Sequence, residues 1–150
     1  GRAIETHVAA SNKKEQVNLR FAWNDQDFSQ VNDKMLSYEN EIAYYDSTRR
    51  AFIKKIRNEF DGLNEYNKPQ THESRRFILT QDSCISFIQA LYRNDILHIN
   101  VVCRSSEVSK TFKHDLHFLG DIGRVAKSEL GVFIDKVHYT VTLGSAHILE

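Results

Sequence analysis

Residues 84–104 read CISFIQALYRNDILHINVVCR, two apolar runs separated by Asn94 and Asp95. Valine, isoleucine, phenylalanine and tyrosine are enriched in strands, and asparagine and aspartate tolerate the left-handed backbone that a two-residue hairpin turn requires. The stretch therefore predicts a β-hairpin. Because both runs are apolar on two faces, we expect them to lie in the middle of a covered sheet.

Working outward from this hairpin, alternating apolar residues predict further strands at 15–22 and 135–143, and a short strand at 75–81. Apolar residues at helical spacing predict helices over about 34–60 and 112–130, each followed by a glycine. Residues 23–33 and 61–74 are polar and are expected to form loops, with a short helix as an alternative within 23–33. Together these elements predict an α+β fold, with a mixed sheet covered by helices. A flexible arm over 1–14 is expected to precede a single domain over 15–150.

Composition narrows the classes of function. Twenty basic residues balance twenty acidic ones, which argues against an extended nucleic-acid surface but not against a small anionic ligand. Two cysteines are too few for a secreted disulfide framework. No apolar run approaches the length of a membrane span, and no signal peptide is visible. We therefore expect reduced thiols and a cytoplasmic protein with no membrane partner, and we find no spacing typical of a metal site.

Three features could carry chemistry, and each also has an ordinary structural explanation. Cys84 could be a nucleophile, although a strand cysteine is more often a small core residue. Arg104 closes the hairpin, where arginines are commonly solvated. Arg75 and Arg76 could bind an anion or could simply form a surface pair. None of the three is specific when taken alone.

Their order along the chain is more informative. The segments FIKKIRNEF, ESRRFI, CISFIQ, VVCRSS and TLGSAHI follow one another with nearly the spacing found in thymidylate synthases and deoxycytidylate hydroxymethylases. The twenty positions from Cys84 to Arg104 match that family without a gap. The chain thus resembles this family over roughly residues 50–148. The resemblance implies the family fold and a homodimer in which one sheet packs against the other.

The resemblance also implies roles for individual residues. Cys84 would add as a thiolate to C6 of a pyrimidine, which makes C5 nucleophilic toward a one-carbon unit. Arg104 and Ser105 would bind the 5′-phosphate, with Arg104 also favouring the thiolate of Cys84. Arg75 and Arg76 would reach the phosphate held by the partner subunit. His147 would contact the ribose. Methylenetetrahydrofolate would be the cofactor of an active enzyme.

Asp115 implies a preference between bases. It stands where thymidylate synthases carry an asparagine that reads uracil and where the hydroxymethylases carry aspartate. A carboxylate accepts the hydrogen bond that the 4-amino group of cytosine donates, so Asp115 points to a cytosine nucleotide. The alternative is an ordinary acidic residue in the first turn of a helix, where the helix dipole favours it.

Several family features are missing from the sequence. The loop that carries the glutamate base and tryptophans has no match before residue 60, and Trp23 is the sole tryptophan. Ser83 replaces the proline before the nucleophile, and Glu107 replaces an aspartate near the folate. Ile148 and Leu149 follow His147 where a tyrosine is expected, and the sequence ends before the family's C-terminal lid.

Three functions remain open on these grounds. The first is a compact enzyme acting at C5 of a pyrimidine nucleotide, most plausibly by hydroxymethylation of a cytosine nucleotide. The second is a non-catalytic, dimeric module that binds a nucleotide and serves as a regulator or scaffold. The third is an interaction domain that shares the fold but not the site.

Overall fold

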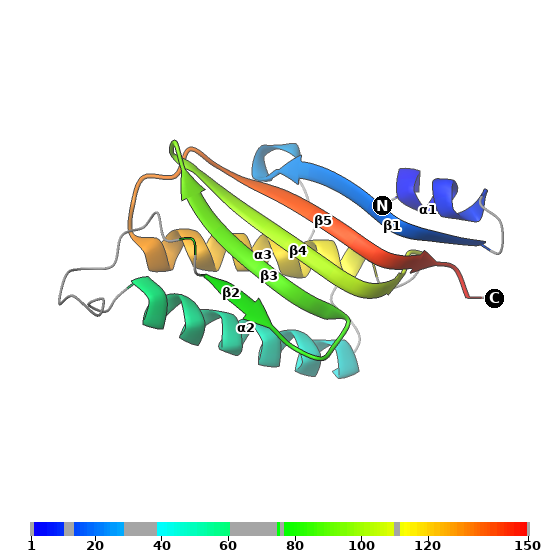
Figure 1. Cartoon of the computed structure of the whole chain (residues 1–150), viewed down its shortest axis with the longest axis horizontal. Helices are drawn as coiled ribbons and strands as arrows, with labels where there is room; N and C mark the ends of the chain where they lie inside the picture. Colours follow the sequence, from blue (N-terminus) through cyan, green and yellow to red (C-terminus); the bar gives the residue numbers. More distant parts are fainter. Residues whose placement is uncertain are drawn as a thin grey trace.

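The computed structural model describes residues 2–10, 14–28, 39–60, 75, 77–109 and 112–149. In these residues the elements follow in the order α1 (Arg2–Ala9), β1 (Glu15–Asn24), the 3-10 helix η2 (Asp25–Phe28), α2 (Glu39–Phe60), β2 (Ile78–Thr80), β3 (Ile85–Arg93), β4 (Ile96–Glu107), α3 (Phe112–Leu130) and β5 (Lys136–His147). The strands form one sheet in the order β1-β5-β4-β3-β2 (Figure 1). Among the described strands only the β4–β5 pair is parallel, because α3 carries the chain back between them. The predicted α+β fold with a mixed sheet is confirmed.

The hairpin that predicted the sheet is present with its turn at Asn94 and Asp95. Both residues have positive φ angles, 53° and 63°, as a two-residue hairpin turn requires. β3 pairs with β4 from Arg93 opposite Ile96 down to Ile85 opposite Cys103. β4 is the central strand of the five, as the sequence indicated.

One face of the sheet is packed against helices. Alternate residues of β4 and β5 are fully buried there, including Ile99, Val101, Val141 and Leu143. α3 lies so close to β5 that a Cβ added at Gly123 would overlap the Tyr139 ring. α2 contacts both α3 and β2, so the two helices form one layer behind the strands (Figure 1).

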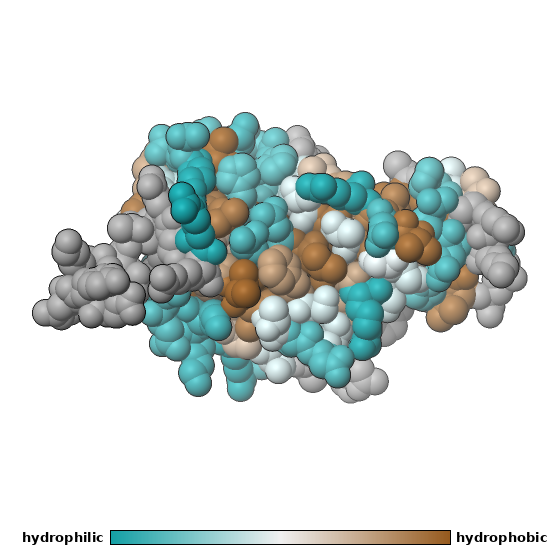
Figure 2. All heavy atoms as spheres, in the orientation of Figure 1, coloured by the Kyte–Doolittle hydropathy of each residue, from teal (hydrophilic) through white to brown (hydrophobic). Residues whose placement is uncertain are grey.

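The opposite face is only partly buried within one chain. Val102, on the central strand, is 38% exposed, and the neighbouring positions carry Gln89 and Asn100, which hydrogen-bond to each other at 3.0 Å. Figure 2 shows brown and pale side chains mixed along this face. The sequence predicted that the hairpin strands are covered on both faces, and the single chain covers one.

The N-terminal segment differs from the expectation of an aperiodic arm. Arg2–Ala9 forms the helix α1, and Val8 is fully buried where α1 packs on β1 and β5. The polar residues of this segment hid a short apolar stripe of Ile4 and Val8, one helical turn apart. The polar stretch 61–74 and the first part of the helix predicted over 34–60 lie outside the described residues, and α2 begins at Glu39. The division into arm and domain stays a prediction.

Candidate functional site

Cys84 and Arg104 lie side by side at one end of the sheet. The backbone amide of Arg104 donates a 2.7 Å hydrogen bond to the carbonyl oxygen of Cys84, which ends the bend between β2 and β3. Both residues are exposed. The twenty-residue spacing seen in the sequence is thus the length of chain that leaves along β3 and returns along β4.

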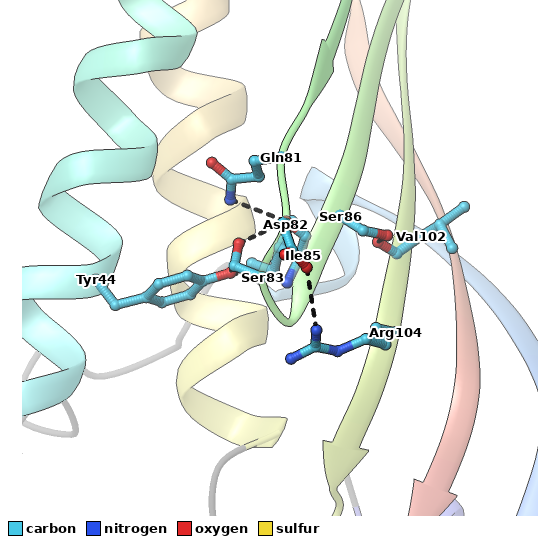
Figure 3. A network of polar contacts seen from close by, with 8 residues as sticks. All are labelled: Tyr44, Gln81, Asp82, Ser83, Ile85, Ser86, Val102 and Arg104. Carbon is cyan, nitrogen blue, oxygen red and sulfur yellow. Dashed lines mark hydrogen bonds and ion pairs between the residues drawn. The ribbon is translucent and has the colours of Figure 1, made fainter.

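α2 holds the bend that precedes β3. The Tyr44 hydroxyl accepts a 2.7 Å hydrogen bond from the amide of Ile85 and lies 3.4 Å from the Ser83 hydroxyl (Figure 3). The Gln81 amide group donates to the carbonyl of Ile85 at 2.9 Å and to Thr48 on α2 at 3.1 Å. Burial raises the pKa of Tyr44, so its hydroxyl keeps its proton at neutral pH. The backbone on both sides of Cys84 is therefore anchored.

The guanidinium of Arg104 faces solvent beside an acidic residue of the same bend. Its Nη1 atom lies 3.3 Å from the Asp82 carboxylate (Figure 3), and the side chain of Arg104 is 61% exposed while that of Asp82 is fully exposed. An exposed ion pair of this length contributes little free energy. A phosphate that offered two oxygens to the planar guanidinium would compete well with Asp82.

The two cysteines have different environments. Cys103 is buried beneath the helices, and desolvation raises the pKa of its thiol well above the usual range, with Asp115 and Cys84 adding to the effect. Cys84 is exposed. Of the two thiols, only Cys84 is accessible to a ligand, which removes the core explanation that the sequence left open for it.

Asp115 lies in the first turn of α3, near this end of the sheet. It accepts a 2.7 Å hydrogen bond from the Tyr45 hydroxyl of α2, and its charge raises the pKa of both Tyr44 and Cys103. The carboxylate is thus close to the bend that carries Cys84. Its position in the first turn also fits the structural explanation, because the positive end of the helix dipole lies there.

Ser105 and His147 lie where the parallel strands β4 and β5 end. Ser105 pairs with Ser145, and Glu107 pairs with His147. The Nδ1 atom of His147 is 3.4 Å from the hydroxyl of Ser145, which donates to Glu15 at 2.7 Å. Ligands commonly bind at the carboxyl ends of parallel strands, and both predicted residues are at that end together with Arg104.

Gly144 allows these two strands to approach. A Cβ at this position would lie 2.8 Å from the carbonyl oxygen of Arg104, closer than real Cβ contacts permit. The glycine of the TLGSAHI segment is therefore required by close packing against the residue that we expect to hold a phosphate.

Arg75 is not brought to Cys84 within one chain. The carbonyl oxygen of Phe77 accepts a hydrogen bond from the amide of Ala90. Ala90 is six residues from Cys84 along the chain, a separation of roughly 20 Å at ~3.3 Å per strand residue. Arg75 precedes Phe77, so its backbone lies near the end of β3 that is distant from Cys84. Its side chain is exposed. Arg76 lies outside the described residues.

Tyr44 and Tyr45 of α2 contact the site most directly. The sequence patterns did not single out either residue. Tyr45 precedes Phe52 by seven residues on the stripe that predicted the helix, so the periodicity does place it on the buried face. A buried tyrosine needs a partner for its hydroxyl, and that need is the signal that could have pointed to Asp115.

Metal-ligand clusters and membrane spans are absent from the described residues. Within 2–10, 14–28, 39–60, 75, 77–109 and 112–149, histidine, cysteine, aspartate and glutamate do not gather in a group of three or more that could hold a metal ion. No helix in that part of the chain is long and apolar enough to cross a membrane.

Comparison with known proteins identifies the fold. No protein-family model and no curated protein sequence matches the chain. Among solved structures, it is similar to thymidylate synthase from T4 phage, with a TM-score of 0.58 and 12% sequence identity over 93% of this chain and 69% of that chain. At this identity the similarity shows that the chain has a thymidylate synthase-like fold.

Proposed function

We propose that the chain binds a pyrimidine nucleoside monophosphate at the end of the sheet where Cys84 and Arg104 meet. The observation that carries the proposal is their hydrogen-bonded pairing, because it presents an exposed thiol and an exposed guanidinium from adjacent backbone positions. A thiol that reacts with a pyrimidine ring and a cation that holds the 5′-phosphate need this juxtaposition.

Each part of the nucleotide has a candidate partner at this end. The phosphate would displace Asp82 from Arg104 and accept a hydrogen bond from Ser105. The Asp115 carboxylate would accept from the 4-amino group of cytosine, which favours deoxycytidylate over deoxyuridylate. His147, at the end of β5, would contact the ribose. A nucleotide lying from β4 and β5 toward the first turn of α3 would meet these residues.

We further propose a homodimer in which the half-exposed faces of two sheets pack together. Arg75 precedes β2 and lies too far from Cys84 to reach the site of its own chain, so it and Arg76 would serve the partner's phosphate. Two neighbouring arginines repel each other unless an anion lies between them, and a phosphate supplies that anion. The exposed Val102 on the central strand supports packing of this face against another sheet.

A second candidate is catalysis at C5 of the bound base, favoured by the exposure of Cys84. Addition of its thiolate to C6 moves the ring electrons to C5, which takes a proton from water. Loss of a proton from C5 and expulsion of the thiolate then restore the aromatic ring. The net reaction exchanges the C5 hydrogen with water and needs no further reactant.

The residues present do not fit methylenetetrahydrofolate well at the one position that can be compared. Glu107 replaces the aspartate expected near the folate, and it is nearly buried. Its Oε1 atom accepts hydrogen bonds from the Ser109 hydroxyl at 2.5 Å and the Leu149 amide at 3.2 Å. The chain itself therefore engages this carboxylate.

Calorimetry with deoxycytidylate and deoxyuridylate tests the binding proposal. We expect binding that Arg104→Ala weakens by one to two orders of magnitude, as the loss of a charge-assisted phosphate contact would produce. Lys136→Ala, at the opposite end of β5, is the matched loss of a positive charge and should leave affinity unchanged. Absence of heat with both nucleotides would leave only the interaction domain.

Release of tritium from C5-labelled nucleotide separates binding from catalysis. Release that Cys84→Ser abolishes would establish the exchange reaction, and stimulation by methylenetetrahydrofolate would establish one-carbon transfer. Binding without any release would assign the chain to the non-catalytic reading, a nucleotide-binding regulator or scaffold. Sedimentation at several concentrations tests the dimer.

A further inference from the structure

α2 and α3 lie side by side, and side-chain contacts at three levels join them. The Tyr45 hydroxyl donates to Asp115 at 2.7 Å, Arg49 donates to Asp121 at 2.8 Å, and Arg57 forms two hydrogen bonds with Glu129 at 2.9 and 3.0 Å. Residue numbers increase together on both helices, so the helices run parallel and the contacts form a seam. The Tyr45–Asp115 contact is at the end of the seam that lies beside the candidate site.

The Tyr45 contact differs from the other two in burial and in chemistry. Arg49 and Arg57 are substantially exposed, and each pairs as a cation with a carboxylate. Tyr45 is 8% exposed and neutral, and its ring stacks on Phe118 with centroids 4.7 Å apart and planes 18° apart. The ring is thus fixed by packing, so its hydroxyl has a defined position from which to donate.

A donor fixed in this way determines how the Asp115 carboxylate is used. The hydroxyl donates to Oδ1, and this hydrogen bond restrains the rotation of the carboxylate about its Cβ–Cγ bond. A held carboxylate can accept from an amino group at one position only, which is how a fixed polar group distinguishes a donor on a ligand from an acceptor. Cytosine offers a donor at its 4-position, whereas uracil offers an oxygen that the carboxylate would repel.

We infer that Tyr45 is a positioning residue that sets the base preference of the site by orienting Asp115 toward the 4-amino group of a cytosine nucleotide. The inference rests on the proposed nucleotide site and adds to it a residue from a different helix. It also accounts for a buried tyrosine in a seam whose other two contacts are partly exposed ion pairs.

The test compares the ratio of deoxycytidylate to deoxyuridylate affinity in four proteins by calorimetry. Tyr45→Phe keeps the ring and its stacking on Phe118 but removes the donor, and we expect it to reduce the preference for deoxycytidylate by about tenfold. Asp115→Asn should abolish or reverse the preference. Arg49→Ala breaks the next contact of the same seam and should leave the ratio as in the wild type.

The outcomes separate this inference from the proposal beneath it. If the wild type binds neither nucleotide, the site itself is wrong. If it binds them but Tyr45→Phe keeps the wild-type ratio, or Arg49→Ala lowers the ratio as much as Tyr45→Phe, then the site stands and the role of Tyr45 is overturned. Thermal unfolding of the three variants, with nucleotide absent, checks that each remains folded.

Discussion

The backbone amide of Arg104 bonds to the carbonyl oxygen of Cys84 across 2.7 Å, so a thiol and a guanidinium twenty residues apart share one rung of the sheet. The β3–β4 hairpin leads to this pair through a register shift between Ile85 and Phe87, and the hairpin register together with that shift sets which residues meet. Any slip of the hairpin would separate the two side chains, and the turn at its other end is therefore part of what aligns the site.

The two thiols should react at very different rates. Cys84 is exposed and Cys103 is buried, with its pKa raised by desolvation. We expect a chromogenic disulfide reagent to modify one thiol in the native protein and two in denaturant. Cys84→Ser should leave no fast thiol, and deoxycytidylate should slow the native reaction. Rapid modification of both thiols in the native wild-type protein would contradict the burial of Cys103.

Two glycines with different surroundings provide a matched pair of substitutions. Gly144→Ala would place a Cβ 2.8 Å from the Arg104 carbonyl, and we expect it to lower the free energy of unfolding by about 1–3 kcal/mol through overpacking. Gly120→Ala, in α3, meets its nearest atom at 4.0 Å and should raise stability by about 0.5–1 kcal/mol. Urea denaturation measures both. Equal effects of the two variants would refute the close approach of β4 and β5.

The hairpin turn should be sensitive to its first residue. Asn94 has a φ angle of 53°, and asparagine tolerates this conformation better than alanine does. Asn94→Ala should therefore cost about 1 kcal/mol, and Asn94→Gly should cost less or stabilise. Urea denaturation checks both values. Indistinguishable midpoints for the two variants would argue against a left-handed residue at this turn.

His98 should make stability depend on pH. Burial lowers the pKa of His98 from 6.5, and His138, at a ring-centroid distance of 5.8 Å, and Arg93 lower it further. The folded protein thus takes up this proton less readily than the unfolded chain does. Stability should be constant above about pH 7 and should fall as the pH drops through 6.5 toward the lower folded value.

A variant without the imidazole provides the control for this pH dependence. In His98→Gln, the thermal-unfolding midpoint should change less between pH 7 and 5.5 than it does in the wild type. Glu129, whose pKa the Arg57 hydrogen bond lowers from 4.5, loses its contribution only at more acidic pH and does not overlap this window. The same slope in wild type and His98→Gln would assign the effect to another group.

The elements that the sequence predicted well are those whose pattern is local. Asn94-Asp95 between two β-rich runs located the hairpin, and the apolar stripe of 112–130 located α3 within its exact bounds. The pairing of Cys84 with Arg104 did not follow from the turn alone, because a regular hairpin would place Cys84 opposite Ser105. The register shift between Ile85 and Phe87 moves the pairing to Arg104. The resemblance then supplied the fold, which the similarity to a solved thymidylate synthase supports.

What the sequence did not reveal depends on contacts between distant elements. Tyr44 and Tyr45 reach Ser83 and Asp115 across 39 and 70 residues, and no periodic pattern encodes such a pair. α1 was passed over because eight residues carry too few apolar positions to show a period. The role that we propose for Arg75 needs a second chain, and contacts between chains leave no periodic pattern in one sequence.

The position of β1 at one edge of the sheet has a consequence for how the chain acquires its structure. Among the described strands, β1, at Glu15–Asn24, has β5, at Lys136–His147, as its one partner, more than a hundred residues later. During synthesis β1 emerges first and must wait for the last strand before its backbone groups find partners. We therefore expect β1 to join the sheet late in folding, after the local β3–β4 hairpin and α3. Until then its unpaired edge is the part of the chain most open to pairing with another nascent chain.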